Sequence, residues 1–128
     1  MRIQKKSLLK VPAIAFAILI FLLSQIPGEK LPPNVFDLQD KVLHLFAYFL
    51  FGLSLIIATA VVKNRTRAFL IVILIGFFYA LLDELHQMFV PNRVCDITDW
   101  AADFLGVVIS LVFLNKLRKW ISNRINIY

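Results

Sequence analysis

The chain has 128 residues, of which 60% are hydrophobic, and its mean hydropathy is +0.80. Soluble domains are about 45–50% apolar, so this composition excludes an ordinary soluble protein and predicts a small integral membrane protein. The net charge of +6 would suit a nucleic-acid-binding protein only if the basic residues formed one patch, and they are instead distributed by segment.

Four apolar stretches divide the chain. A bilayer core of about 30 Å needs about 20 helical residues, and stretches 8–26, 42–62, 68–90 and 97–117 come close to that length. We therefore predict an all-α fold, an integral membrane bundle of four transmembrane helices that forms one domain over residues 1–128.

The first stretch follows basic residues, as the apolar part of a signal peptide does. No small-residue cleavage pattern closes it around Ser24, so we expect an uncleaved helix. Residues 27–40 include three prolines, which disfavour helix and predict a connection outside the membrane.

The second stretch places three polar side chains on one helical face. Lys41, His44 and Tyr48 follow an i, i+3, i+7 spacing, and Asp40 before them is a predicted helix cap. One such residue near a helix end often serves only as a membrane anchor. Three on one face indicate a site.

The third stretch carries ionisable residues close to its end. Tyr79, Asp83 and His86 share one face, and Glu84 and Gln87 share an adjacent one. Ionisable side chains inside a membrane are costly and almost always face protein or a wet cavity. We expect the two faces to meet two different neighbouring helices.

The fourth stretch has a single stripe of acids and small residues. Asp96, Asp99, Asp103, Gly106 and Ser110 lie on one helical face, and the small residues allow a close approach of another helix. Asp96 is the predicted N-cap, with Asp99 as its capping-box partner.

Basic residues indicate the orientation in the membrane. Eleven of the fourteen lie at the amino terminus, between the second and third helices, and in the C-terminal segment (Arg2, Lys5, Lys6, Lys10, Lys63, Arg65, Arg67, Lys116, Arg118, Lys119, Arg124). The positive-inside rule then predicts a multi-pass cell-membrane protein with both termini in the cytoplasm and all eight acids toward the outside. The charge is explained by orientation, so no nucleic-acid partner is expected.

Three helices and one connection thus bring polar side chains to the outer part of the membrane. The candidate binding residues are Lys41, His44, Tyr48, Asp83, Glu84, His86, Gln87, Arg93, Asp96 and Asp99, and the candidates for a catalytic role are Glu84, His86, His44 and Asp99.

The order of these motifs resembles that of the VanZ-like membrane proteins. The matching segments are 24–28 (SQIPG), 40–48 (DKVLHLFAY) and 83–93 (DELHQMFVPNR), followed by Asp96, Asp99 and Gly106. That family is associated with low-level teicoplanin resistance, so the resemblance implies a protein that lowers glycopeptide susceptibility. Where the family pattern has asparagine this chain has Asp103, which adds an acid to the cluster.

Two functions fit the polar cluster. In the first, the protein binds or alters a cell-surface component: Arg93 and Lys41 engage phosphate or carboxylate, and the partners are membrane lipid with a lipid-linked cell-wall precursor or a glycopeptide. In the second, it is a membrane-embedded enzyme acting on a lipid-linked or cell-wall substrate, with Glu84 or an aspartate as base and His44 or His86 as acid or base.

Three other interpretations are weaker or remain open. Glu84 and His86 point about 200° apart on a helix, so one ion would need His86 with Asp83 and further ligands from elsewhere, and no metal or cofactor is expected. Transport is disfavoured because few polar residues continue toward the cytoplasm. A purely structural network of buried polar groups is the remaining alternative.

Overall fold

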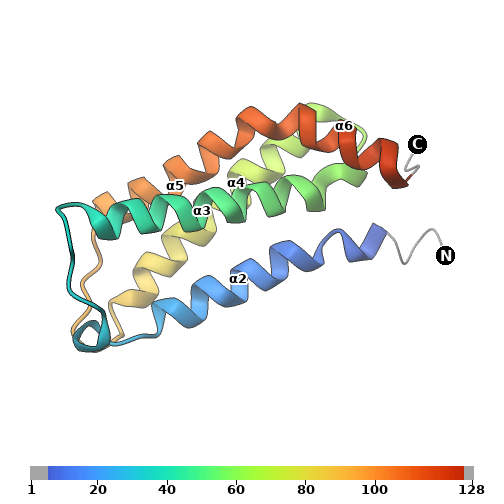
Figure 1. The fold of residues 1–128 in the computed structure, drawn as a ribbon. Helices are drawn as coiled ribbons and strands as arrows, with labels where there is room; N and C mark the ends of the chain where they lie inside the picture. Colours follow the sequence, from blue (N-terminus) through green and yellow to red (C-terminus); the bar gives the residue numbers. More distant parts are fainter. Residues whose placement is uncertain (1–5, 126–128) are drawn as a thin grey trace.

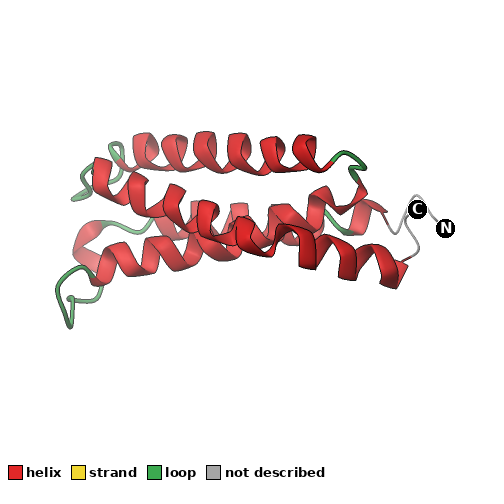
Figure 2. Cartoon of the chain, turned by 90° about the horizontal axis from the view of Figure 1, so that it is seen from above, coloured by secondary structure: helices red, strands yellow, loops and turns green. Residues whose placement is uncertain are grey.

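A computed structural model describes residues 6–125, so Arg2 and Lys5 lie outside the described part. This part is helical and contains no strand (Figure 2). Four of its helical segments are long and apolar enough to cross a membrane: Lys6–Ser24, Gln39–Val61, Arg65–Gln87 and Ile97–Ile125. The prediction of four apolar helices is confirmed.

The helices run antiparallel in chain order (Figure 1). They are α2 (Val11–Ser24), η1 (Gly28–Lys30), α3 (Gln39–Ala58), η2 (Thr59–Val61), α4 (Arg65–Gln87), α5 (Ile97–Ser110), η3 (Leu111–Phe113) and α6 (Leu114–Ile125). Figure 1 shows the connections 25–38 and 88–96 together at one end of the bundle, which we call the site end. Connection 62–64 lies at the opposite end.

The two connections at the site end are bonded to each other. Gly28 N donates to the Pro91 carbonyl over 3.0 Å, and Asn92 Nδ2 donates to Glu29 Oε2 over 2.9 Å. A side chain at Gly28 would overlap the Asn92 carbonyl. The glycine is therefore needed where the connections cross.

Helix α4 is displaced relative to its predicted bounds. It begins at Arg65, where Asn64 Oδ1 accepts from Arg67 N over 2.8 Å, and it ends at Gln87 instead of residue 90. Phe89 and Val90 make tighter i→i−3 bonds before Pro91. The 23 residues still span about 34 Å, and Asp83 and Glu84 lie in the last two turns.

Two further helix ends differ from the predictions. Helix α3 begins at Gln39 after Leu38 with φ 63°, which makes no side-chain cap, so the prediction that Asp40 caps this helix is wrong. The last span continues past residue 117 to Ile125 through η3. Its buried Ile121 packs against Ala60, and Arg118 donates to the Val62 carbonyl.

Helices α3 and α5 approach most closely at their glycines. A Cβ atom added to Gly106 would lie 2.8 Å from Phe49 N and closer still to the Leu45 carbonyl. A Cβ atom added to Gly52 would lie 2.8 Å from Ser110 Cβ. The small residues thus allow close approach of another helix, as expected, and the structure shows that this helix is α3.

Candidate functional site

Lys41 joins the first turns of α3 and α5. Its Nζ donates to Asp99 Oδ1 over 2.5 Å and to Asp96 Oδ2 over 3.1 Å, and Asp40 Oδ2 lies 3.6 Å away. These three carboxylates occupy the N–H donors of the Lys41 ammonium group. Lys41 therefore holds α5 in register with α3.

Asp96 caps α5, as predicted, and its Oδ1 accepts from both the backbone N–H and the hydroxyl of Thr98. These two bonds, followed by Lys41, lower the pKa of Asp96 from 3.8 to about 2. The predicted capping-box partner is wrong, because Asp99 binds Lys41. The backbone N–H of Asp96 donates instead to Glu84 Oε2 of α4, over 2.9 Å.

His44 pairs with Asp103 one helical turn further along the same faces. The distance from His44 Nδ1 to Asp103 Oδ1 is 2.9 Å, and Asp103 is fully buried. Sequence reasoning left Asp103 out of the candidate site because it departs from the resembled pattern. Its place on the stripe between Asp99 and Gly106 was the signal that it faces α3.

Asp83 ties three helices together. Its Oδ1 accepts from Ser24 Oγ of α2 over 2.5 Å, and its Oδ2 accepts from Tyr48 Oη of α3 over 3.1 Å. All three residues are buried. Ser24 was not among the predicted site residues, although it opens the SQIPG motif that ends the first helix.

The two polar faces of α4 meet different elements, as expected. Tyr79 Oη donates to the Ala17 carbonyl of α2 over 2.5 Å. His86 also faces α2: its Nε2 lies 2.8 Å from Gln25 Nε2, and its ring lies 5.1 Å from that of Phe21. Glu84, on the other face, reaches the start of α5. His86 therefore lies on the α2 side of α4 and does not line the cavity described below.

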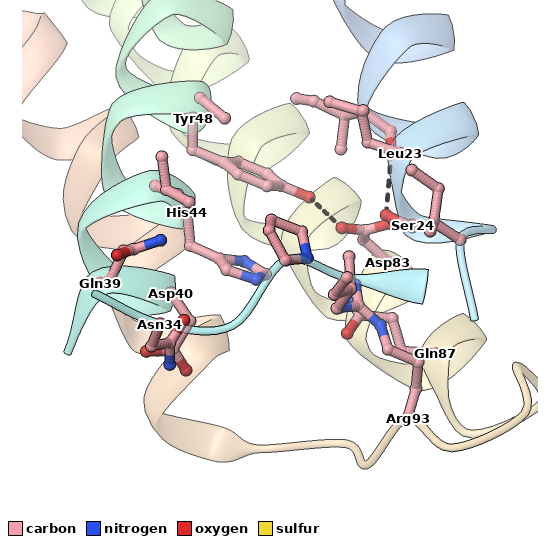
Figure 3. Close-up of a pocket in the computed structure, with 16 residues that line it drawn as sticks. Leu23, Ser24, Asn34, Gln39, Asp40, His44, Tyr48, Asp83, Gln87 and Arg93 are labelled. Atoms are coloured by element: carbon pink, nitrogen blue, oxygen red, sulfur yellow. Dashed lines mark hydrogen bonds between the residues drawn. The ribbon is translucent and has the colours of Figure 1, made fainter. Parts of the chain in front are cut away.

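A cavity of about 220 Å³ opens between α2, α3 and α4 at the site end. His44 and Tyr48 project into it from α3, Asp83 and Gln87 come from α4, and Arg93 reaches it from connection 88–96 (Figure 3). The remaining lining residues come mostly from α2, connection 25–38 and the start of α3: Ile20, Leu23, Ser24, Ile26, Leu31, Pro32, Asn34, Gln39, Asp40, Leu43 and Ala47. The lining thus combines polar and apolar side chains.

Two nitrogen donors on residues that line the cavity have no acceptor. Gln87 Nε2 and Arg93 Nε are buried nitrogen atoms, and neither has a hydrogen-bond partner among the described residues. Buried polar groups without partners are rare, and each costs about 1–3 kcal/mol. A bound group that supplies an acceptor would satisfy both.

Of the ten candidate binding residues, five line the cavity: His44, Tyr48, Asp83, Gln87 and Arg93. Lys41, Asp96, Asp99 and Glu84 instead form the bonded contacts beside it, between α3, α4 and α5. Glu84, Asp96 and Asp99 also line a second cavity, next to α4 and the start of α5. The structure thus assigns these residues to different surroundings, a distinction that helical periodicity alone did not make.

The order of these side chains along the chain has the pattern of a known family. The model of the VanZ/LLP1 family matches residues 5–118. The chain belongs to the VanZ/LLP1 family. Searches of curated proteins and of solved structures gave no match. VanZ/LLP1 membership, together with four apolar helices, identifies a multi-pass membrane protein. The match also covers every residue that lines the cavity.

Proposed function

We propose that this VanZ/LLP1 protein binds the anionic head group of a cell-envelope amphiphile in the cavity and thereby lowers susceptibility to glycopeptides such as teicoplanin. The observation that carries the proposal is the pair of unpartnered buried donors, Gln87 Nε2 and Arg93 Nε, on residues that line a cavity together with apolar side chains. A phosphate or carboxylate would accept from both donors.

The apolar residues of the lining favour a lipid-linked ligand over a free anion. Ile20, Leu23, Ile26, Leu31 and Leu43 are among the residues that line the cavity. Hydrocarbon placed against them is removed from water, at about 25 cal/mol for each Å² buried. Lipid-linked cell-wall precursors combine such a chain with phosphate. Lys41 supports this site from outside the cavity, because Asp96 and Asp99 hold its ammonium group.

We also infer that the site end faces the outside of the cell membrane and that both termini are cytoplasmic. The opposite end has the basic connection 62–64, with Lys63 followed by Arg65 and Arg67, and the basic helix α6 (Figure 1). The positive-inside rule places such segments in the cytoplasm. Cell-wall precursors and glycopeptides meet at the outer surface, so this orientation puts the cavity where it would act.

Replacement of Arg93 tests the proposed binding. We expect Arg93→Gln to abolish any decrease in teicoplanin susceptibility that wild type confers on a susceptible bacterium, because the cationic donor is lost. Lys30→Gln is the matched control, since Lys30 is an exposed cation in the other connection at the site end and lies outside the cavity. The measurements are the inhibitory concentration of teicoplanin and the membrane abundance of each variant.

His86→Ala tests whether protection depends on the residues that line the cavity or on any polar residue at the site end. His86 contacts α2 and does not line the cavity, so this variant should stay close to wild type in the same assay. The proposal fails if Arg93→Gln, at normal abundance, protects as well as wild type. It also fails if His86→Ala loses protection at normal abundance while Arg93→Gln keeps it.

Cys95 provides the test of orientation. It is the only cysteine and is exposed in connection 88–96. We expect a membrane-impermeant maleimide to label it in intact cells. Partial desolvation and the nearby Glu84 raise the pKa of the Cys95 thiol, so labelling should be done at mildly alkaline pH, where more thiolate is present.

The matched control carries Lys63→Cys in a Cys95→Ser background, which moves the thiol to the opposite connection. That variant should react only after the cells are permeabilised. The inferred orientation is wrong if the two proteins show the reverse pattern.

An acid–base enzyme is the second candidate, and one contact favours it. His44 lines the cavity while its ring bonds to Asp103, which is how a carboxylate orients a general acid or base. Turnover of a lipid-linked substrate by purified protein, lost in His44→Gln, would support this function over binding alone.

A further inference from the structure

His44, Glu84 and Asp103 converge from three different helices, α3, α4 and α5. One ligand atom from each, a ring nitrogen of His44 and a carboxylate oxygen of each acid, lies within 4.8 Å of the other two. Glu84 and Asp103 are 1% and 0% exposed, respectively. Two buried carboxylates and an imidazole thus share a small volume beside the cavity.

The hydrogen bonds within the protein leave this cluster incomplete. Glu84 Oε2 accepts from Asp96 N and Asp103 Oδ1 contacts His44, but Glu84 Oε1 and Asp103 Oδ2 are buried without any donor in the described part of the chain. Each buried acid therefore keeps one carboxylate oxygen that is free to accept a hydrogen bond or to coordinate a cation. An unpaired carboxylate in such a place is strongly unfavourable.

No lysine or arginine among the described residues neutralises the two acids, and a protonated His44 would balance only one of them. Lys41 contacts Asp40, Asp96 and Asp99, and within residues 6–125 no lysine or arginine nitrogen lies within 4.0 Å of a Glu84 or Asp103 oxygen. Asp83, from the same helix as Glu84, adds another acid nearby and is satisfied by Ser24 and Tyr48. A bound cation or an added proton is therefore needed to offset the negative charge of the cluster.

We propose that His44, Glu84 and Asp103 form a binding site for a divalent metal ion, with Zn²⁺ the best match and Mn²⁺ the alternative ion. One imidazole with two carboxylates is a donor set that these ions accept, whereas Mg²⁺ prefers oxygen ligands and retained water. Three protein ligands leave a coordination position open, as in catalytic zinc sites.

The geometry requires only small movements. Bonds of about 2.0–2.2 Å to one ion place ligand atoms roughly 3–4 Å apart, so the three side chains must close by about 1 Å. They lie on separate helices, which explains why spacing within one helix argued against a metal. The inference stands apart from the proposed ligand binding, because it concerns the ion alone.

Ion binding by the purified full-length protein in detergent micelles tests the site. After extraction with a chelator, wild type should take up one Zn²⁺ per chain, measured by elemental mass spectrometry, with its affinity measured by calorimetry. Glu84→Gln and Asp103→Asn should each weaken binding by more than about tenfold. Asp37→Asn is the control, an exposed acid of connection 25–38 outside both the cavity and the three-residue cluster, and should retain the stoichiometry. Circular dichroism and gel filtration check folding.

A second measurement uses wild type alone and so does not depend on variants that fold. The chain has two histidines, and His86 lies at the α2 contact outside the cluster. In protein labelled with ¹⁵N-histidine, Zn²⁺ should shift the ring nitrogen signals of His44 and leave those of His86 in place. His86→Gln assigns the two signals.

Three results would overturn the proposal. The first is no stoichiometric binding of Zn²⁺ or Mn²⁺ to wild type, which would mean that a proton neutralises the cluster. The second is equal affinity in wild type, Glu84→Gln and Asp103→Asn. The third is a shift of His86 without a shift of His44.

Discussion

Gly106→Leu should lower the free energy of unfolding by about 3 kcal/mol or more, because overpacking a closely packed contact typically costs about 1–3 kcal/mol and here the obstacle is backbone. Even a Cβ atom at this position would lie 2.8 Å from Phe49 N and closer to the Leu45 carbonyl. Helix α3 cannot move these atoms without moving as a whole. The measurement is thermal or denaturant unfolding in detergent micelles.

The same substitution should also disrupt the polar contacts of the site end. The contacts of Lys41 with Asp99 and of His44 with Asp103 both cross between α3 and α5, so separating the helices lengthens them. Leu105→Ala is the matched control, because Leu105 is 49% exposed on the outer side of α5. Equal stability of Gly106→Leu and wild type would contradict the close approach of these helices.

Asp83→Ala should lower the free energy of unfolding by about 2–4 kcal/mol, since two hydrogen bonds to one buried carboxyl group are lost together. The Ser24 and Tyr48 hydroxyls would each lose their contact with Asp83. We expect a value in the lower half of this range, because a polar group of a membrane protein that loses one hydrogen bond often forms another. Unfolding in detergent micelles measures the effect.

Two further variants test whether the loss of stability comes from the lost hydrogen bonds or only from the lost negative charge. Asp37→Ala removes an exposed acid from connection 25–38 and should leave stability almost unchanged. Tyr48→Phe removes only one of the two bonds to Asp83. In the double variant Asp83→Ala/Tyr48→Phe the losses should be less than additive. Full additivity would mean that Tyr48 and Asp83 do not interact in the folded protein.

The polar residues of the site end therefore divide into contacts that hold helices and groups that remain available. Asp83 and Lys41 each join elements through short, satisfied contacts. Gln87, Arg93, Glu84 and Asp103 each keep a buried atom without a partner. A purely structural network explains the first set well. The second set is what motivates the proposed ligand and metal sites.

Helical periodicity predicted much of this arrangement from the sequence. The apolar stretches determined four spans because each is long enough to cross a bilayer. The i, i+3, i+7 spacing predicted that Lys41, His44 and Tyr48 share a face, and all three make contacts inside the bundle. These are local properties that depend on a residue's own helix.

Only the tertiary structure decided which polar side chains meet across helices. Asp83 contacts α2 and α3, and His86, one turn further along α4, faces α2 without lining the cavity. Asp103 of α5 joins His44 of α3 and Glu84 of α4. Such meetings depend on helix rotation and separation, which Gly106 sets by direct backbone contact. The sequence by itself thus determined a membrane bundle with a polar end, and packing decided which of those residues line a cavity, which hold helices, and which converge on a common point.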